Sequence, residues 1–124
     1  MMHTVVVADD DADLRELVGI STERAGLRLV ASVADGRAAL EAILALTPDL
    51  AILDISMPEL TGVEVCREVR REVTQHDVRI LLLSASADEA SRAAGLESGA
   101  DHFMIKPFSP RDLVAWLSTG KEAR

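Results

Sequence analysis

Short apolar runs alternate along the chain with stretches in which apolar residues recur at helical spacing. The runs span residues 4–8, 27–33, 50–53, 78–83 and 102–105. Val, Ile and Leu dominate the first four, and polar residues seldom interrupt them, as is typical of strands buried on both faces. The pattern therefore predicts a parallel sheet that helices cover on both sides.

The stretches between the runs predict helices. In the first three, the positions on one helical face are Leu14, Leu17, Val18, Ser21 and Ala25, then Leu40, Ile43 and Leu44, then Val65, Cys66, Val69 and Val73. Ser86 with Glu89 has the form of a capping box at the start of a fourth helix, and Gly99 suits its C-terminal end. Ser109 and the proline after it open a fifth helix, which we expect to end at Gly120. Strict alternation of five strands and five helices gives an α/β sandwich with right-handed crossovers.

Composition agrees with one domain over residues 1–124, with a core between about residues 4 and 119. Hydrophobic residues make up 48% and charged residues 27%, which excludes a disordered or collagen-like chain. Cys66 is the single cysteine, which excludes an internal disulfide framework, and we expect it in the core. A net charge of −8 argues against nucleic-acid binding by this segment. No apolar run approaches the ~20 residues of a membrane span and no signal peptide is recognisable, so we expect a cytoplasmic location.

Polar side chains collect where the predicted strands end, the edge at which open parallel sheets bind ligands. They follow four of the strands: Asp9, Asp10 and Asp11 the first, Asp54 the third, Ser84 the fourth and Lys106 the fifth. Asp35, after the second, has the position of a helix cap. Each alone has an ordinary structural explanation, such as a helix-terminal charge, a turn, a strand-end hydroxyl or a surface cation. Their occurrence together favours a shared site, whereas His3, His76 and His102 are too scattered for a zinc site.

The charges at this edge indicate a divalent cation. Asp9, Asp10 and Asp54 together would carry −3, and Lys106 would offset one charge. Two carboxylates ~4 Å apart repel by ~4 kcal/mol at an effective dielectric constant of ~20, so the cluster needs a cation or a proton. Carboxylate oxygens suit Mg²⁺ or Mn²⁺. A bound ion would leave positions at which a phosphate oxygen could replace water.

In their order and spacing these residues resemble the receiver domain of a bacterial two-component response regulator, from about Val5 to Leu117. The motifs that carry the resemblance are Asp9-Asp10, Asp54 with Met57-Pro58 and Gly62, Ser84-Ala85, and Lys106-Pro107-Phe108. The resemblance implies a flavodoxin-like (βα)5 three-layer sandwich, in which a five-stranded parallel sheet has the order 2-1-3-4-5. A chemotaxis regulator is among the known examples of this fold, with ligands bound at the same edge.

The resemblance also implies the chemistry. Asp54 would be the phosphoacceptor and would attack the phosphohistidine of a sensor histidine kinase or phosphotransfer protein. Asp10, Asp54 and the backbone carbonyl of Ser56 would bind Mg²⁺ directly, and Asp9 would act through a water. The domain would catalyse only its own phosphorylation and dephosphorylation, so we do not expect an enzyme in the ordinary sense.

Signalling would begin at Lys106 and the Ser84 hydroxyl, each contacting a phosphoryl oxygen. Movement of Ser84 would let Phe103 turn inward and alter the face of the fourth helix, fifth strand and fifth helix, through which relatives dock partners or form homodimers. The thin apolar stripe of the fourth helix, interrupted by Gly95, fits a mobile element. The resemblance further implies a cis bond between Lys106 and Pro107.

Two departures and two alternatives accompany the resemblance. Ser56 and Ser86 occupy positions that tune phosphoryl lifetime and are small, so we expect hydrolysis that is not unusually slow; Phe103 replaces a frequent tyrosine. A haloacid-dehalogenase-type phosphatase would need an acid where Ser56 stands and a nucleophile after an early strand. A pseudo-receiver would use the fold only to bind proteins. Any DNA-binding effector domain would lie C-terminal to Arg124, because this segment is acidic.

Overall fold

The computed structural model describes residues 3–72, 78–85 and 88–122, in which five strands alternate with five helices. The elements are β1 (Thr4–Ala8), α1 (Ala12–Arg24), β2 (Arg28–Val33), α2 (Gly36–Leu46), β3 (Leu50–Asp54), α3 (Gly62–Glu72), β4 (Arg79–Ser84), α4 (Glu89–Glu97), β5 (His102–Ile105) and α5 (Pro110–Glu122). All pairings are parallel, and the strand order is β2-β1-β3-β4-β5. The predicted architecture and strand order are therefore confirmed.

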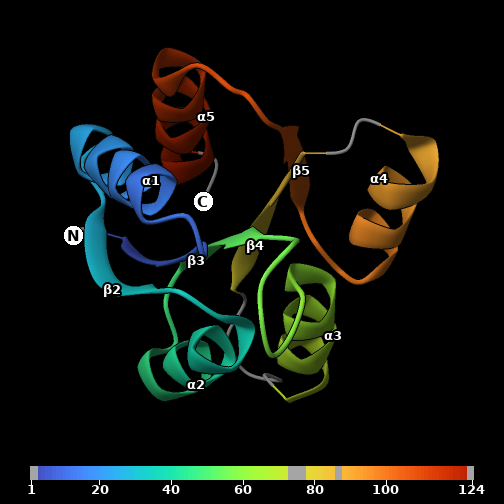
Figure 1. Cartoon of the computed structure of the whole chain (residues 1–124). Coiled ribbons are helices and arrows are strands. Elements are labelled where there is room, and N and C mark those ends of the chain that lie inside the picture. The colour runs from blue at the N-terminus through green and yellow to red at the C-terminus, as the bar shows by residue number, and fades with distance from the viewer. Residues whose placement is uncertain (1–2, 73–77, 86–87, 123–124) are drawn as a thin grey trace.

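Helices cover both faces of the sheet (Figure 1). On one face, Val18 of α1 and Leu117 of α5 belong to a buried apolar cluster with residues of β1, β3 and β4. On the other face, Ile43 of α2 and Val69 of α3 pack in a second cluster. α4 lies at the β5 edge, where Gly95 meets side chains of that second cluster. The result is the three-layer arrangement that buried parallel strands require.

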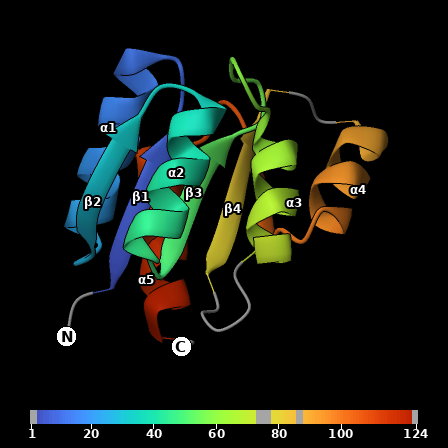
Figure 2. The ribbon, with the colours of Figure 1, turned by 90° about the horizontal axis from the view of Figure 1, so that it is seen from below.

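The register brings the carboxyl ends of the strands to one edge (Figure 2). Ala8 of β1 pairs with Leu53 of β3, and Ser84 of β4 pairs with Ile105 of β5. The residues that follow Ala8, Leu53 and Ile105 are consequently neighbours along a single edge. This is the place at which the sequence predicted a shared site.

Three strands differ from their predicted bounds by one residue. β2 begins at Arg28, one residue later than the apolar run suggested, and β3 extends to Asp54. β4 runs from Arg79 to Ser84, one residue later at each end than its apolar run. Asp54 pairs with Leu83, so it is part of the ladder. A polar residue at the end of a buried strand interrupts the hydrophobic pattern without ending the strand, which is why the pattern alone placed these residues just outside.

Several helix ends follow the predicted signals. The Asp35 carboxylate accepts a hydrogen bond from the Ala38 N–H at 2.8 Å, which caps α2. Ser109 Oγ accepts one from the Asp112 N–H at 3.0 Å at the start of α5. Gly99 follows α4 with φ of +107°, a conformation that glycine adopts without the steric penalty of a side chain.

Two helix ends differ from the prediction. The N-cap of α4 is Asp88, whose carboxylate accepts a hydrogen bond from the Ser91 N–H at 2.7 Å. α5 does not end at Gly120 but continues to Glu122; glycine within a helix costs only ~1 kcal/mol relative to alanine, so it need not end one. Val73 of the predicted third helix, His76, and Ser86 of the predicted capping box lie outside the described part of the chain.

Candidate functional site

Three carboxylates converge at the carboxyl edge of the sheet. Asp54 ends β3, and Asp9 and Asp10 follow β1. One oxygen of each lies within 4.8 Å of those of the other two. Asp9 and Asp54 are buried, with 1% and 4% of their surface exposed, whereas Asp10 is exposed. The acidic cluster thus has buried sides and one side open to solvent.

Lys106 joins this cluster from the residue after β5. Its Nζ lies 2.9 Å from Asp54 Oδ1 and 3.2 Å from Asp9 Oδ2. The side chain is 19% exposed, so both ion pairs are largely shielded from water. One ammonium therefore binds two buried carboxylates that come from different strands.

The pKa values of Asp54 and Lys106 reflect burial and their mutual contact. Burial raises the pKa of Asp54 because the carboxylate loses hydration; the Lys106 hydrogen bond opposes this, and the charge of Asp9 adds to it. Burial alone would lower the pKa of Lys106, but its hydrogen bond with Asp54 and the two negative charges outweigh burial, and the pKa is raised. Lys106 consequently stays charged, and the site retains excess negative charge.

The donor set fits a hard divalent cation. Three carboxylates and one ammonium leave a formal charge of −2, from −3 and +1. Asp9 is already bound by protein donors at both oxygens, since Oδ1 accepts the Asp11 N–H at 2.9 Å and Oδ2 accepts from Lys106. Asp10 is the exposed member of the group. Oxygen-only ligands beside open space suit Mg²⁺, which keeps several waters when bound to proteins.

The loop after β3 folds back over Asp54. The Ile55 N–H donates to the Leu83 carbonyl, and the Gly62 N–H donates to the Ile55 carbonyl, both at 2.9 Å. A Cβ atom on Gly62 would lie 2.5 Å from the Asp54 carbonyl oxygen, so only glycine permits this approach. Ser56, whose carbonyl the resemblance assigned to the metal, is exposed within this loop.

Ser84 and Phe103 lie on neighbouring strands at the same face of the sheet. Leu82 pairs with Phe103, and Ser84 is two residues further along β4, so its side chain points to the same face as that of Leu82. Ser84 is 4% and Phe103 8% exposed. The Ser84 carbonyl accepts the Lys106 N–H at 2.7 Å, and the Lys106–Pro107 peptide bond is cis.

Sequence reasoning missed Arg15. Its Nη1 donates a hydrogen bond to the Asp9 carbonyl at 2.7 Å. Composition does not separate Arg15 from Arg24, which stands in the last turn of the same helix. The position of Arg15 in the first turn of the helix could have indicated the contact, because helical side chains point back toward the N-terminus, where the acidic residues lie.

The chain is similar to known response regulators. The sequence profile of the response regulator receiver domain matches residues 5–118. The DNA-binding response regulator MtrA of Mycolicibacterium paratuberculosis is 41% identical over 115 residues, which cover 93% of this chain and 49% of MtrA. The phosphate regulon transcriptional regulatory protein PhoB of Pseudomonas aeruginosa is 37% identical over 114 residues, which cover 92% of this chain and 49% of PhoB. This chain therefore spans about half the length of these curated relatives.

The fold has a close counterpart among solved structures. The signal receiver domain of NarL from Mycobacterium tuberculosis superposes with a TM-score of 0.90 at 34% identity, covering 99% of this chain and 98% of that one. Sequence and fold agree over almost the whole chain, and the acidic edge lies within the matched region. The chain therefore belongs to the receiver domain family of two-component response regulators.

Proposed function

We propose that this receiver domain accepts a phosphoryl group on Asp54 from the phosphohistidine of a sensor histidine kinase or phosphotransfer protein, in a reaction that requires Mg²⁺ or Mn²⁺. The observation that carries the proposal is the position of Lys106 Nζ, 2.9 Å from Asp54 Oδ1 and 3.2 Å from Asp9 Oδ2. It provides a fixed cation beside the nucleophile, where phosphoryl oxygens would arrive. Positioning and charge neutralisation supply most of the catalysis in phosphoryl transfer.

In the proposed step, a carboxylate oxygen of Asp54 forms a P–O bond while the P–N bond of the phosphohistidine breaks, and the electron pair of that bond returns to the imidazole nitrogen. Asp10, Asp54 and the Ser56 carbonyl would hold Mg²⁺, which when bound neutralises charge on the phosphoryl oxygens. Asp9 would act on the ion through a water, as the resemblance implies, while its two carboxylate oxygens accept from the Asp11 N–H and from Lys106. The domain would catalyse only its own phosphorylation and dephosphorylation.

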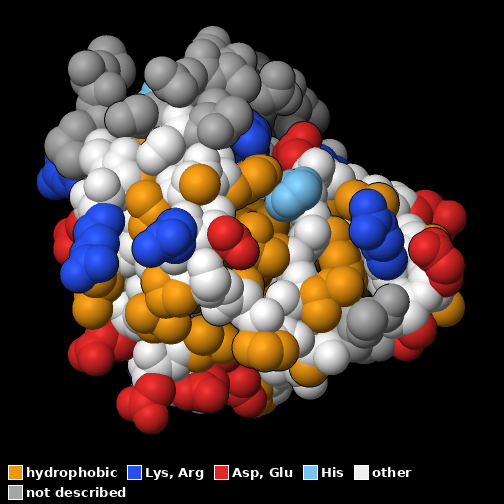
Figure 3. All heavy atoms as spheres, turned by 90° about the horizontal axis from the view of Figure 1, so that it is seen from above, with side chains coloured by type: hydrophobic (Ala, Val, Ile, Leu, Met, Phe, Trp, Pro, Cys, Tyr) orange, Lys and Arg blue, Asp and Glu red, His pale blue; other side chains and the backbone are white. Residues whose placement is uncertain are grey.

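We expect the signal to pass from the phosphoryl group to the α4–β5–α5 face. Lys106 and the Ser84 hydroxyl would contact phosphoryl oxygens, and Phe103 would follow Ser84. The face carries exposed apolar side chains, including Leu96 at 41% and Ile105 at 37%, among scattered charged ones (Figure 3). Such a surface suits a protein partner or a second copy of the chain.

Partners follow from the same proposal. A groove of about 440 Å³ opens beside Lys106, and its lining is mainly apolar: Leu14, Leu17, Ala85, Pro107 and Phe108. It would receive apolar side chains of the phosphodonor protein. MtrA is named as DNA-binding and this chain covers half its length, so we propose an effector domain C-terminal to this segment, with no nucleic-acid contact by the segment itself.

We propose a cytoplasmic location, where a histidine kinase would supply the phosphoryl group. In the described part of the chain, no helix has the length and apolar character needed to span a membrane. We also propose that this segment does not itself bind a membrane.

Incubation with acetyl phosphate and Mg²⁺ separates this proposal from the alternatives. A receiver gains one hydroxylamine-labile phosphate, detectable by intact mass; a phosphatase turns acetyl phosphate over continuously; a pseudo-receiver stays unmodified. A serine stands two residues after Asp54, where the phosphatase would need an acid, and the nucleophile ends the third strand instead of an early one. Both features favour the receiver.

Asp54→Asn tests the assigned acceptor. The variant should stay folded and gain no phosphate, whereas the control Asp13→Asn, at an exposed position in the first turn of α1, should be labelled like the wild type. Full labelling of Asp54→Asn would show that another residue is the acceptor.

A further inference from the structure

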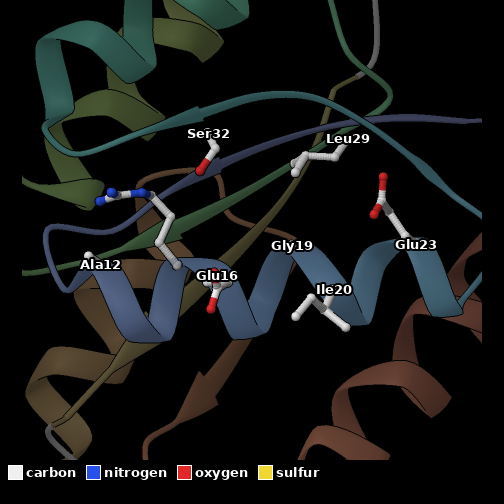
Figure 4. Close-up of a pocket in the computed structure, with 8 residues that line it drawn as sticks. Ala12, Glu16, Gly19, Ile20, Glu23, Leu29 and Ser32 are labelled. Atoms are coloured by element: carbon white, nitrogen blue, oxygen red, sulfur yellow. The ribbon is translucent and has the colours of Figure 1, made fainter.

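Arg15 reaches from the first turn of α1 back to the acidic loop. Its Nη1 donates to the Asp9 carbonyl at 2.7 Å, and the side chain is partly buried. Arg15 also lines a groove between α1 and β2. Ala12, Gly19 and Ser32 line the same groove (Figure 4). The contact therefore links the helix to the backbone that carries the acidic pair.

This bond completes the fixation of Asp9. The Asp9 N–H donates to the Val33 carbonyl at 3.1 Å, Oδ1 accepts from the Asp11 N–H, and Oδ2 accepts from Lys106. The carbonyl oxygen is the fourth polar atom, and Arg15 binds it. All four polar atoms of Asp9 are thus held, each by a different residue.

Asp10 is the next residue along the chain from this anchored aspartate. Its carboxylate is exposed, yet one oxygen lies within 4.8 Å of those of Asp9 and Asp54. The peptide group that joins Asp10 to Asp9 is the one whose carbonyl Arg15 holds. We propose that Arg15 is a positioning residue for the Mg²⁺ site, acting through the Asp9 carbonyl to keep the Asp10 carboxylate in ligating position. The inference rests on the metal-dependent function proposed above.

Two physical effects of Arg15 have opposite signs. A guanidinium near the site repels a cation, so its removal would tighten Mg²⁺ binding if charge were decisive. Loss of the hydrogen bond would release the Asp10 backbone and weaken binding. Arg15 donates to a neutral carbonyl rather than to a carboxylate, so we infer that placement is the larger effect. Groups that orient metal ligands typically change affinity ~10–100-fold when removed.

Isothermal titration with MgCl₂ tests the proposal. We compare the wild type with Arg15→Ala, Arg15→Lys and the control Arg24→Ala, which removes an exposed arginine from the last turn of the same helix. Arg15→Ala should bind Mg²⁺ ~10-fold more weakly. Arg15→Lys should be intermediate because it keeps the charge but loses the planar fork, and Arg24→Ala should match the wild type. With acetyl phosphate, saturating Mg²⁺ should return the Arg15→Ala labelling rate to near the wild-type value.

The direction in which Arg15→Ala changes the Mg²⁺ affinity decides between the two effects. Unchanged or tighter Mg²⁺ binding by Arg15→Ala would overturn the proposal, as would a lower melting temperature with unchanged affinity, which assigns Arg15 a purely structural role. If Arg15→Ala does not fold, wild-type affinity in Arg15→Lys overturns it. A wild-type protein that binds no Mg²⁺ would instead overturn the proposed function itself.

Discussion

Gly95 of α4 lies directly against the ring of Phe103. A Cβ atom on Gly95 would come within 3.1 Å of Phe103 Cδ2 and 3.1 Å of Leu82 Cδ1. Gly95 is the buried residue of α4, while its neighbour Leu96 is 41% exposed. The backbone of α4 at Gly95 therefore packs directly against Phe103, the proposed switch residue. A change in the position of the Phe103 ring would displace α4.

This contact predicts that Gly95→Ala destabilises the fold. Alanine in place of glycine should stabilise a helix by ~1 kcal/mol, but overpacking a tight contact costs ~1–3 kcal/mol. We expect a net loss of about 1 kcal/mol in the free energy of unfolding, measured by urea denaturation, and recovery in Gly95→Ala/Phe103→Leu. Ala93→Gly, at an exposed site in α4, measures how much the difference in helix propensity between alanine and glycine alone changes the stability. A gain of stability in Gly95→Ala would contradict the contact.

Lys106→Ala should make stability depend more strongly on Mg²⁺ than in the wild type. Without the ammonium, the buried Asp9 and Asp54 carboxylates lose their fixed cation, and we expect a loss of about 3 kcal/mol in metal-free buffer. Mg²⁺ should still bind and restore most of the loss, because a ligand that binds only the folded state stabilises it. Denaturation with and without MgCl₂ measures both; an equal loss in the two buffers would contradict the electrostatic role.

The same variant tests signalling. Because Lys106 would hold a phosphoryl oxygen, Lys106→Ala should take up phosphate from acetyl phosphate without the chemical-shift changes at Phe103 that the wild type shows by NMR. Lys106→Arg, which keeps the charge, serves as the control. Normal phosphate-dependent shifts at Phe103 in Lys106→Ala would rule out the role given to this lysine.

The sequence predicted the acidic edge because parallel topology requires it. Once the apolar runs were identified as parallel strands, Asp54 and Lys106 had to end at one edge of the sheet, whatever the loops between them. The side-chain contacts of Arg15 and Arg70 could not be predicted this way, because they depend on how far a flexible side chain reaches across tertiary structure. The close packing at Gly95 could not be predicted either, because the sequence shows only a missing side chain and the structure shows that it lets α4 approach Leu82 and Phe103.

The surroundings of His102 should make the stability of the fold depend on pH. Its ring stacks on Trp116 of α5 with centroids 5.0 Å apart, and Arg79 of β4 lies over Trp116, 5.0 Å from its ring centroid. Burial lowers the pKa of His102, and the positive charges of Arg92 and Arg79 lower it further. The unfolded chain therefore binds a proton at higher pH than the folded one.

The sign of the effect follows from linkage. Above the unfolded pKa of about 6.5 the imidazole is neutral in both states; below it the unfolded state gains a proton first, so the free energy of unfolding falls until the folded pKa is reached. Denaturation between about pH 7.5 and pH 5.5 should show this fall, and His102→Phe, which keeps a ring beside Trp116, should reduce it. Identical pH profiles of the two proteins would contradict the assignment.

Arg70 should be the most stabilising arginine of α3. Its Nε donates to the Gly99 carbonyl at 2.9 Å, Nη1 to the Val78 carbonyl at 2.6 Å and Nη2 to Asp101 Oδ2 at 2.9 Å. These bonds tie α3 to the start of β4 and to the turn after α4. At ~1 kcal/mol for each bond, Arg70→Ala should lose about 2–3 kcal/mol. Arg71, 74% exposed and paired only with Glu68 among the described residues, is the matched control and should lose under ~0.5 kcal/mol.

Cys66 offers a local probe of the same connection. It is fully buried, its Sγ donates to the Ser98 carbonyl at 3.4 Å, and burial raises its thiol pKa, so it should react slowly with a thiol reagent in the folded protein. Loss of the Arg70 bonds should loosen the turn that covers it and speed its labelling by at least ~10-fold, the factor that corresponds to ~1.4 kcal/mol of easier opening. Arg71→Ala should label at the wild-type rate. Equal labelling rates in Arg70→Ala and Arg71→Ala would show that the end of α4 is held by other contacts, even if their global stabilities differ.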